Sequence, residues 1–373
     1  MKYYLIAGEA SGDLHGSNLI RAIHRHDPEA TVRCWGGDRM EQAGATLVKH
    51  YRELSFMGFL EVLKNLPTIF QNLSLCKKDI ENFAPDALIF IDFSGFNLRI
   101  AKWARQQGYR THYYISPQVW ASRAGRVQKI KRDIDSMYVI LPFEKAFYEE
   151  KYGMPVHFVG HPLIDALQAQ AETDPLQFRN AHGLPAEKPI IAMLPGSRPQ
   201  EIGTMLPIML TLAPKYPNYQ FVVAGAPSLA PAFYEQYLKD SPAILVTDQT
   251  YPLLRISHAA LVTSGTATLE TALLKVPQVV CYKGNWVSYQ IAKRLITLEY
   301  ISLVNLILDQ EVVTELIQND LTPERLAAEL DKILEGPGRQ KQLDAYQKLE
   351  QLLGGPGASN KAAKLIVDFS KDS

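Results

Sequence analysis

Cysteine is scarce in this 373-residue sequence, and long apolar segments are absent. Cys34, Cys76 and Cys281 are widely spaced without a C-x-x-C pair, which indicates buried, reduced thiols and no disulfide framework. No histidine pair has zinc-site spacing and no acidic run matches a calcium loop, so we expect no metal and no cofactor. No window approaches 18 uninterrupted apolar residues, and the N-terminal apolar stretch is too short for a signal peptide. These absences predict a cytoplasmic protein without a membrane span.

Net charge is also lacking, because 39 Lys and Arg residues balance 39 Asp and Glu residues. No global field would therefore attract nucleic acid, which we do not expect as a partner, and any anionic ligand must meet a local patch. Apolar residues make up 47% of the chain and charged residues 21%, as in folded globular proteins. The length exceeds what one hydrophobic core usually organises, so two domains are expected.

Short apolar runs alternate with segments of helical periodicity along most of the chain. The strands predicted for the first half are Tyr3–Ala7, Thr31–Trp35, Ala87–Asp92, Thr111–Ile115, Ser136–Leu141 and Val156–Val159. Those for the second half are Pro189–Leu194, Gln220–Ala224, Ile244–Val246, Ala259–Val262 and Gln278–Tyr282. Alternating strands and helices predict the α/β class, with two Rossmann-like, doubly wound parallel sheets. We expect domains at 1–163 and 164–345, and a helical segment at 346–373 that could pack back on the first domain.

Ligands of such sheets bind beyond the carboxyl ends of the strands, so the loops that follow each strand carry the functional signal. The first loop, GEASGDLHG at 8–16, does not match G-x-G-x-x-G, and Trp35-Gly36-Gly37 stands where a ribose-binding acid would end the second strand. A nicotinamide dinucleotide is therefore not expected. Ser11 and Gly12 still allow a ligand to approach the backbone, although a tight strand-to-helix turn would explain the glycines equally.

The third strand ends in FIDFSGFN, with Asp92 at its edge and Asn97, a candidate contact to a substrate, just beyond. A carboxylate that is partly removed from water binds its proton more tightly, which suits it to act as a general base. A helix cap or an ion-paired acid is the structural alternative.

The fourth strand precedes ISPQVWASRAGRVQKIKR, which combines one aromatic residue with several cations. Candidate contacts to a sugar phosphate in this segment are Ser116, Trp120, Arg123, Arg126, Lys129 and Lys131. A solvated basic helix face would have the same composition.

Two loops of the second half predict a nucleotide diphosphate site. LPGSR closes a buried strand with Gly196, Ser197 and Arg198, and a guanidinium there can bind a diphosphate through two hydrogen bonds. LVTSGTATLE brings a second strand to the start of a helix, whose free N–H groups favour phosphate. Its candidate contacts are Ser264, Gly265, Thr266 and, for ribose hydroxyls, Glu270. A plainly capped turn is the alternative.

Residues 56–73 carry more apolar side chains at helical spacing than one core-facing side needs. A membrane-facing patch would consist of Phe56, Met57, Phe59, Leu60, Leu63, Leu66 and Phe70. A fully buried helix pair is the alternative, because residues at this spacing usually belong to a core.

Six motifs in order give the sequence a specific resemblance: GEASGDLHG, MGFLEV, YYISPQVWA, LPGSR, SGTATLE and YISLVN at 300–305. Together they resemble the bacterial lipid A disaccharide synthases, glycosyltransferases of family 19, from about residue 3 to residue 320. The resemblance implies the GT-B arrangement, in which two Rossmann-like domains face each other across a cleft.

The resemblance also implies a reaction. A UDP-linked 2,3-diacylglucosamine would give its sugar, with inversion, to the 6-hydroxyl of 2,3-diacylglucosamine 1-phosphate. Asp92 would be the base, Arg198 would bind the diphosphate, and Asn305 would contact the UDP-sugar. The resemblance implies a peripheral protein on the cytoplasmic face of the inner membrane and is compatible with a homodimer. Alternatives are another GT-B enzyme of UDP-sugars, such as a UDP-N-acetylglucosamine 2-epimerase or the transferase that makes lipid II, or a non-catalytic nucleotide- or lipid-binding module.

Overall fold

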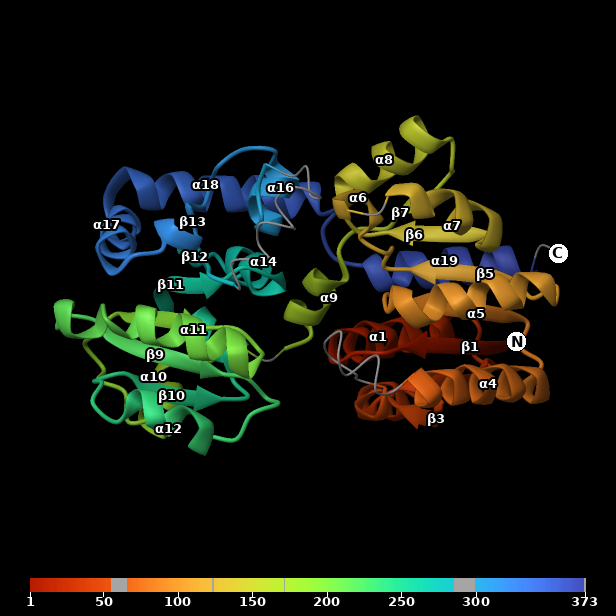
Figure 1. The fold of residues 1–373 in the computed structure, drawn as a ribbon, viewed down its shortest axis with the longest axis horizontal. Coiled ribbons are helices and arrows are strands. Elements are labelled where there is room, and N and C mark those ends of the chain that lie inside the picture. Colours follow the sequence, from red (N-terminus) through yellow and green to blue (C-terminus); the bar gives the residue numbers. More distant parts are fainter. Residues whose placement is uncertain (55–65, 123, 171, 285–298, 372–373) are drawn as a thin grey trace. The chain divides into compact units, whose positions relative to one another are not determined.

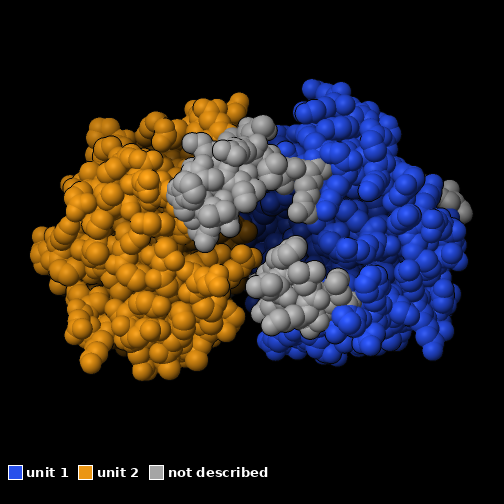
Figure 2. Space-filling model, in the orientation of Figure 1, with its two compact units in different colours: residues 1–169, 353–373 blue, residues 170–352 orange. Residues whose placement is uncertain are grey.

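The computed structural model describes residues 1–54, 66–122, 124–170, 172–284 and 299–371 (Figure 1). Contacts divide the chain into two compact units, shown in different colours in Figure 2: residues 1–169 with 353–373, and residues 170–352. The first unit extends past residue 163, where the sequence suggests a boundary, because helix α9 (Pro162–Gln168) packs against the first and the last helix. Residues 346–352 belong to the second unit.

The first unit is built on a seven-stranded sheet of order β3-β2-β1-β4-β5-β6-β7, and every neighbouring pair is parallel. Its strands are β1 (Lys2–Ala7), β2 (Thr31–Gly36), β3 (Thr46–His50), β4 (Ala87–Ile91), β5 (Thr111–Tyr114), β6 (Ser136–Val139) and β7 (His157–Phe158). Its other helices are α1 (Ala10–His26), α2 (Asp38–Gln42), α4 (Leu66–Phe83), α5 (Ser94–Gln106), α6 (Val119–Ser122), α7 (Val127–Asp133), α8 (Pro142–Tyr152) and α19 (Ala358–Lys371), with short 3₁₀ turns at Tyr51–Glu53 and Ala124–Arg126.

The second unit has a six-stranded parallel sheet of order β10-β9-β8-β11-β12-β13. Its strands are β8 (Ile190–Leu194), β9 (Gln220–Gly225), β10 (Ile244–Thr247), β11 (Ser257–Thr263), β12 (Gln278–Tyr282) and β13 (Glu315–Ile317). Its helices are α10 (Pro175–Ala181), α11 (Pro199–Leu210), α12 (Ala232–Leu238), α13 (Thr250–Arg255), α14 (Thr266–Leu273), α16 (Leu303–Leu308), α17 (Pro323–Leu334) and α18 (Gly336–Leu352), with 3₁₀ turns at Ala213–Lys215 and Gln318–Asp320.

The prediction of two doubly wound α/β sheets is confirmed. The burial of the strands explains why the sequence marks them as apolar runs. Strands such as β4 and β8 are buried along their whole length, as expected when helices cover both faces of a parallel sheet. Two strands that the sequence does not predict, β3 and β13, lie at sheet edges. Both are only partly buried and therefore lack the continuous apolar run that marks a central strand.

Helix α19 returns the chain to the first unit, where it packs along α1. The turn before it contains Gly354, Gly355 and Gly357. All three have positive φ, which residues other than glycine rarely adopt. Gly160 also has positive φ, and a Cβ there would lie 3.1 Å from the carbonyl oxygen of Leu353. This close backbone approach is what allows the last helix to dock.

The three cysteines are free and buried. Within the part of the chain that the structure describes, no helix is both long and apolar enough to cross a membrane.

Asp13 connects the first two strand-to-helix turns of the first unit. Its carboxylate is 3% exposed and accepts hydrogen bonds from the backbone N–H groups of Gly37 (2.8 Å), Met40 (3.0 Å) and Arg39 (3.3 Å). It therefore satisfies the free donors at the start of α2 and holds the β2–α2 turn against α1.

We expect Asp13→Ala to lower the free energy of unfolding of the first unit by about 2 kcal/mol or more, because buried N–H donors lose a charged acceptor. Glu29→Ala removes an exposed carboxylate from the same unit and serves as the control. Thermal and urea unfolding of the full chain compare the two variants. Equal stability of both would contradict the anchoring role of Asp13.

Candidate functional site

Each sheet has one point where the strand order reverses, and the loops that contain Asp92, Arg198 and Ser264 follow strands at these two points. In the first unit the reversal lies between β1 and β4, and in the second between β8 and β11. At such a point the connections leave in opposite directions and expose a crevice at the carboxyl ends of the two strands, where ligands of doubly wound sheets bind.

Asp92 follows β4 directly, and its backbone is held in an unusual conformation. Asp92 and Phe93 both have left-handed φ, 44° and 45°, which non-glycine residues adopt only when neighbours hold them. The carbonyl oxygen of Asp92 accepts hydrogen bonds from the Asn97 amide (2.9 Å) and the Tyr113 hydroxyl (2.5 Å). The Asn97 amide also donates to the carbonyl of Ile6 in β1 (3.3 Å) and to that of Ile91 in β4 (3.2 Å).

The carboxyl group of Asp92 is half-buried at the edge of this turn. Burial, together with the negative charge of the nearby Glu9, raises its pKa to about 6, although the Phe93 amide partly offsets the rise. The N-cap of α5 is Phe93, and Asp92 forms no ion pair with the residues that the structure describes. The carboxyl group is thus neither a helix cap nor part of a salt bridge. At neutral pH it is a carboxylate that binds a proton readily.

The GEASGDLHG loop packs tightly against this turn. A Cβ on Gly8 would come within 2.3 Å of the Phe93 ring, and one on Gly12 within 3.0 Å of the Ala7 side chain. The glycines are therefore needed for packing of the turn itself. Ser11 is exposed in the first turn of α1, where its hydroxyl is accessible to a ligand.

Glu144, at the start of α8, organises the SPQVWA segment. It is 1% exposed, and its carboxylate accepts hydrogen bonds from the hydroxyl of Ser116 and from the indole N–H of Trp120 (3.1 Å). The backbone N–H groups of Ile140 and Leu141 donate to its other oxygen. Burial raises the pKa of Glu144, and these four hydrogen bonds oppose the rise.

The rest of this basic segment divides between two roles. Lys131 donates to the carbonyls of Tyr152 (3.2 Å) and Gly153 (2.9 Å) and so caps the end of α8. Arg126 and Lys129 line a separate cavity. Arg123 lies outside the described residues.

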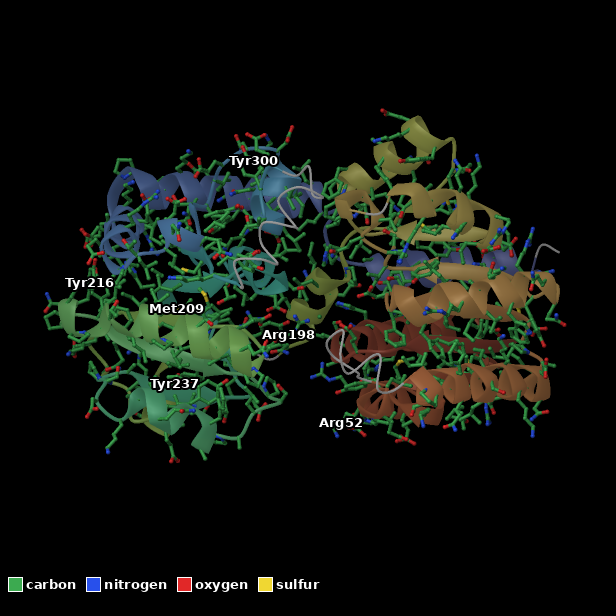
Figure 3. All side chains as sticks on the ribbon, viewed as in Figure 1. Arg52, Arg198, Met209, Tyr216, Tyr237 and Tyr300 are labelled. Carbon is green, nitrogen blue, oxygen red and sulfur yellow. The ribbon has the colours of Figure 1, made fainter. Side chains whose placement is uncertain are left out.

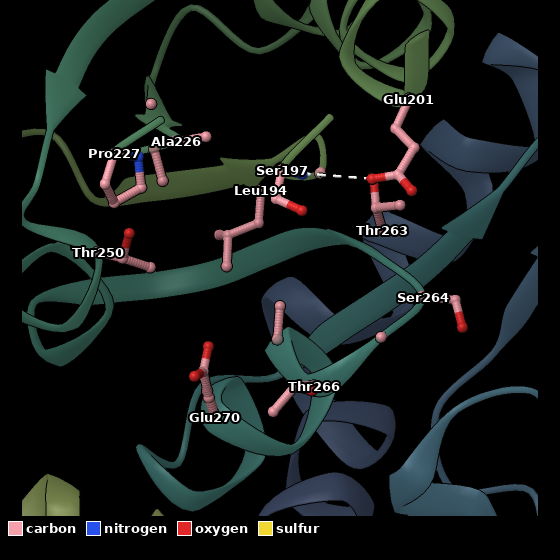
Figure 4. Close-up of a pocket in the computed structure, with 15 residues that line it drawn as sticks. Leu194, Ser197, Glu201, Ala226, Pro227, Thr250, Thr263, Ser264, Thr266 and Glu270 are labelled. Carbon is pink, nitrogen blue, oxygen red and sulfur yellow. Dashed lines mark hydrogen bonds between the residues drawn. The ribbon is translucent and has the colours of Figure 1, made fainter. Parts of the chain in front are cut away.

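The two predicted loops of the second unit enclose a single pocket of about 300 Å³ (Figure 4). It opens at the carboxyl ends of β8, β9 and β11. Six predicted residues line it: Gly196, Ser197, Ser264, Gly265, Thr266 and Glu270. The two loops, about 65 residues apart in the sequence, therefore meet at one pocket.

Polar groups of this pocket are positioned for a ligand that offers hydrogen bonds. The Thr263 hydroxyl is buried and has no partner among the described residues, which is uncommon unless a ligand or water completes it. Glu270 accepts a hydrogen bond from the Tyr251 hydroxyl (2.7 Å), and burial raises the pKa of its carboxyl group. Gly265 has φ 155° and ψ −162°, a region that only glycine occupies easily, and it precedes the free N–H groups of α14.

Arg198 is the N-cap residue of α11, and its side chain is 63% exposed (labelled in Figure 3). Its guanidinium lies 3.4 Å from Glu201, which also accepts the Ser197 N–H at 3.3 Å. A Cβ on Gly196, where φ is 117°, would lie 2.9 Å from the Glu201 side chain. Glu201 therefore fixes the LPGSR turn while leaving the guanidinium exposed.

Asn305 is fully buried, and its amide is saturated by hydrogen bonds inside the second unit. It donates to Val313 (2.8 Å) and Glu315 (2.9 Å), and it accepts from Val312 (2.8 Å) and Val313 (3.0 Å). Glu315 in turn accepts the N–H of Ile301. The carbonyl of Ile301 receives the Ser264 hydroxyl at 3.1 Å. Asn305 thus supports the pocket loop through this chain of contacts.

Most of the predicted membrane patch lies outside the described residues: Phe56, Met57, Phe59, Leu60 and Leu63. Helix α4 begins at Leu66, and Phe70 in its second turn is 66% exposed.

Sequence reasoning missed Glu144, Glu201 and Thr263. The two glutamates share a signal, since each is the third residue of a helix that starts with proline, Pro142 in α8 and Pro199 in α11. A glutamate at that position commonly reaches back to the free N–H groups that precede its helix.

Comparisons with known proteins agree with the family resemblance that these loops carry. Residues 3–368 match the family described as lipid-A-disaccharide synthetase. The lipid-A-disaccharide synthase of Geobacter metallireducens is 38% identical over 373 aligned residues, covering 98% of this chain and 96% of that protein. The enzyme of the same name from Coxiella burnetii is 37% identical, covering 97% of this chain and 96% of that protein.

Solved structures of similar fold are far more distant in sequence. The UDP-GlcNAc 2-epimerase from Neisseria meningitidis bound to UDP-GlcNAc has a TM-score of 0.63 at 16% identity, over all of both chains. The glycotransferase of kitacinnamycin has a TM-score of 0.66 at 15% identity, over 98% of each chain. These structures establish a shared fold only. The family match over nearly the whole chain, with relatives near 38% identity, establishes that the chain belongs to the lipid-A-disaccharide synthetase family.

Proposed function

We propose that the protein is a lipid-A-disaccharide synthase. It transfers 2,3-diacylglucosamine from its UDP-linked donor to the 6-hydroxyl of 2,3-diacylglucosamine 1-phosphate, giving the β-1,6 disaccharide 1-phosphate and UDP. The observation that carries the proposal is the 38% identity, along nearly the whole chain, to enzymes of that name. UDP-N-acetylglucosamine 2-epimerase activity is disfavoured, because that likeness rests on fold at 16% identity.

Asp92 is the general base of this proposal. Its carboxylate removes the proton of the acceptor 6-hydroxyl as that oxygen attacks the anomeric carbon, and the bond to the diphosphate breaks on the opposite face. A pKa of about 6 suits this task, since the group is mostly ionised at neutral pH yet accepts a proton better than an ordinary aspartate. Asn97 is then a positioning residue, because its amide is used to hold the Asp92 carbonyl.

The pocket of the second unit receives UDP. The N–H groups at the start of α14 and the guanidinium of Arg198 stabilise the negative charge that develops on the departing diphosphate. Glu270 and the unpartnered Thr263 hydroxyl supply hydrogen bonds for the nucleoside. Asn305 acts through Ser264 as a positioning residue.

Both lipid substrates must reach the site from a bilayer. We assign the contact with that bilayer, at the cytoplasmic face of the inner membrane, to residues 56–70. Phe70 belongs to that patch, and its exposure supports the assignment.

The reaction is tested by measuring UDP release from UDP-diacylglucosamine with and without the monosaccharide 1-phosphate. We expect release only when both are present, together with a disaccharide product. Release of UDP in the absence of acceptor, or interconversion of UDP-N-acetylglucosamine epimers, would contradict the proposal.

Asp92→Asn should lower kcat by a factor of roughly 10² or more while UDP binding is retained, as for removal of a general base. In the wild type, kcat/KM should fall about tenfold for each pH unit below pH 6, because the proton then blocks the base. Asp38→Asn, on an exposed carboxylate of the same unit, is the control. Near-normal turnover of Asp92→Asn would remove Asp92 from the mechanism.

Asp92→Asn should also stabilise the first unit at alkaline pH. The folded-state pKa of Asp92 lies above that of the unfolded chain, so the wild type loses stability as the pH rises from about 4 to 6. Asparagine carries no such charge, and we expect a gain on the order of 1 to 2 kcal/mol at pH 8 that disappears near pH 4. Unfolding at both pH values measures the difference. A gain that is the same at both would show that ionisation of Asp92 is not its source.

Arg198→Ala should weaken UDP binding about tenfold or more and slow transfer, because the leaving diphosphate loses a charge-assisted hydrogen bond. Arg198→Lys should restore only part of both, since an ammonium lacks the planar fork of the guanidinium. The control is Arg325→Ala, which removes an exposed arginine of the second unit. UDP titration and single-turnover rates measure the effects, and unchanged binding in Arg198→Ala would refute the role.

A further inference from the structure

The first unit contains a second, strongly basic cavity that the reaction outlined above does not yet use. It lies where α5 and α7 pack together and has a volume of about 670 Å³. Its lining comprises Ser94, Gly95, Leu98, Arg99, Lys102, Arg126, Lys129, Arg132 and Asp133. Five of these nine residues are cationic and one is acidic.

The acidic residue does not neutralise the cavity. Asp133 is 6% exposed and forms two hydrogen bonds of 2.6 Å with the guanidinium of its neighbour Arg132, so the two charges compensate each other. Lys102 and Lys129 are exposed and make no hydrogen bond or ion pair within the described ranges of the chain. Ammonium groups gathered around one cavity repel each other unless an anion occupies it.

The cavity begins next to the proposed base. Ser94 and Gly95 open α5 immediately after Asp92 and Phe93, and Gly95 faces open space. Arg99 lies about one helical turn after Gly95 and donates to the Gly95 carbonyl, so its cationic side chain folds back toward this end of the helix. An acceptor whose hydroxyl meets Asp92 would therefore lie beside the start of α5, where the cavity begins.

We propose that this α5–α7 cavity binds the phosphate of the acceptor, with Lys102 and Lys129 as its principal ligands. The inference rests on the proposed function, since it names where the 1-phosphate of the acceptor monosaccharide is held. A phosphate monoester is the ligand that fits, because it is compact and doubly charged and accepts several hydrogen bonds. A concave site of this size suits one such group with part of its sugar.

The test is the double variant Lys102→Gln/Lys129→Gln, with Lys145→Gln on α8 as a control at an exposed lysine of the same unit. We expect the KM for the acceptor to rise about tenfold or more in the double variant, while the Kd for UDP and the kcat at saturating acceptor stay within about twofold. With an acceptor that lacks the phosphate, the acceptor KM of the wild type should rise to that of the double variant. The KM of the double variant should not rise further. Melting temperatures of all three proteins verify that the substitutions leave the fold intact.

Three outcomes would overturn the inference. An unchanged acceptor KM, or a defect of the same size with the dephosphorylated acceptor, would show that the lysines do not hold the phosphate. Lost binding to phosphatidylglycerol vesicles with an unchanged KM in detergent micelles would assign the cavity to the membrane instead.

Binding of glucosamine 1-phosphate to the full chain, followed by phosphorus NMR, separates this inference from the proposed reaction. Binding by the wild type that the double variant loses supports the cavity even if no transfer is detected. Active transfer by the wild type without any such difference between the two proteins contradicts the cavity and leaves the reaction intact.

Discussion

The amide of Asn97 is the contact on which the geometry of the first unit's site depends. It joins carbonyl groups at the ends of β1 and β4, the two strands between which the sheet reverses its order, and it also holds the carbonyl of Asp92. This bridge, together with the Tyr113 hydroxyl that also donates to the Asp92 carbonyl, satisfies acceptors at two strand ends and in a left-handed turn. The position of the Asp92 carboxylate thus follows from the hydrogen bonds that hold its backbone.

The second unit reaches a comparable rigidity by a different route. Glu201, in the first turn of α11, accepts a hydrogen bond from the LPGSR turn. Asn305 donates to Glu315, which holds the backbone of Ile301, and Ser264 donates to the Ile301 carbonyl. In both units the supporting amides, and in the second unit Glu201 and Glu315, bind groups of the protein itself. The loops are thus held in place without a ligand, and the proposed substrates would require little further ordering of them.

The parts of the fold that sequence predicts well are those in which local pattern and burial coincide. Central strands such as β4 and β8 read as apolar runs, and the glycine-containing loops behind them mark the functional edge of each sheet. What could not be predicted depends on which side chain meets which across the fold. Asn97 and Asn305 look like ligand contacts in sequence, yet their amides are buried and bound to backbone. Arg99 and Lys102 look like ordinary surface cations of α5 until α7 is placed beside them. Periodicity carries no information on that pairing.

Local strain in the first unit is concentrated at the carboxyl ends of adjacent strands. Asp92 and Phe93 after β4, and Ile115 after β5, all have left-handed φ, and for a β-branched isoleucine at 65° this is a marked outlier. Each such residue costs about 1 to 3 kcal/mol, which a sheet buried on both faces can offset because its central strands are fully packed. The same turn keeps a half-buried carboxylate with a raised pKa, a further penalty at neutral pH. Selection for stability alone would remove both the left-handed backbone and the half-buried charge. Their coincidence at the edge of the sheet where ligands of this fold bind therefore supports the proposed catalytic role of Asp92.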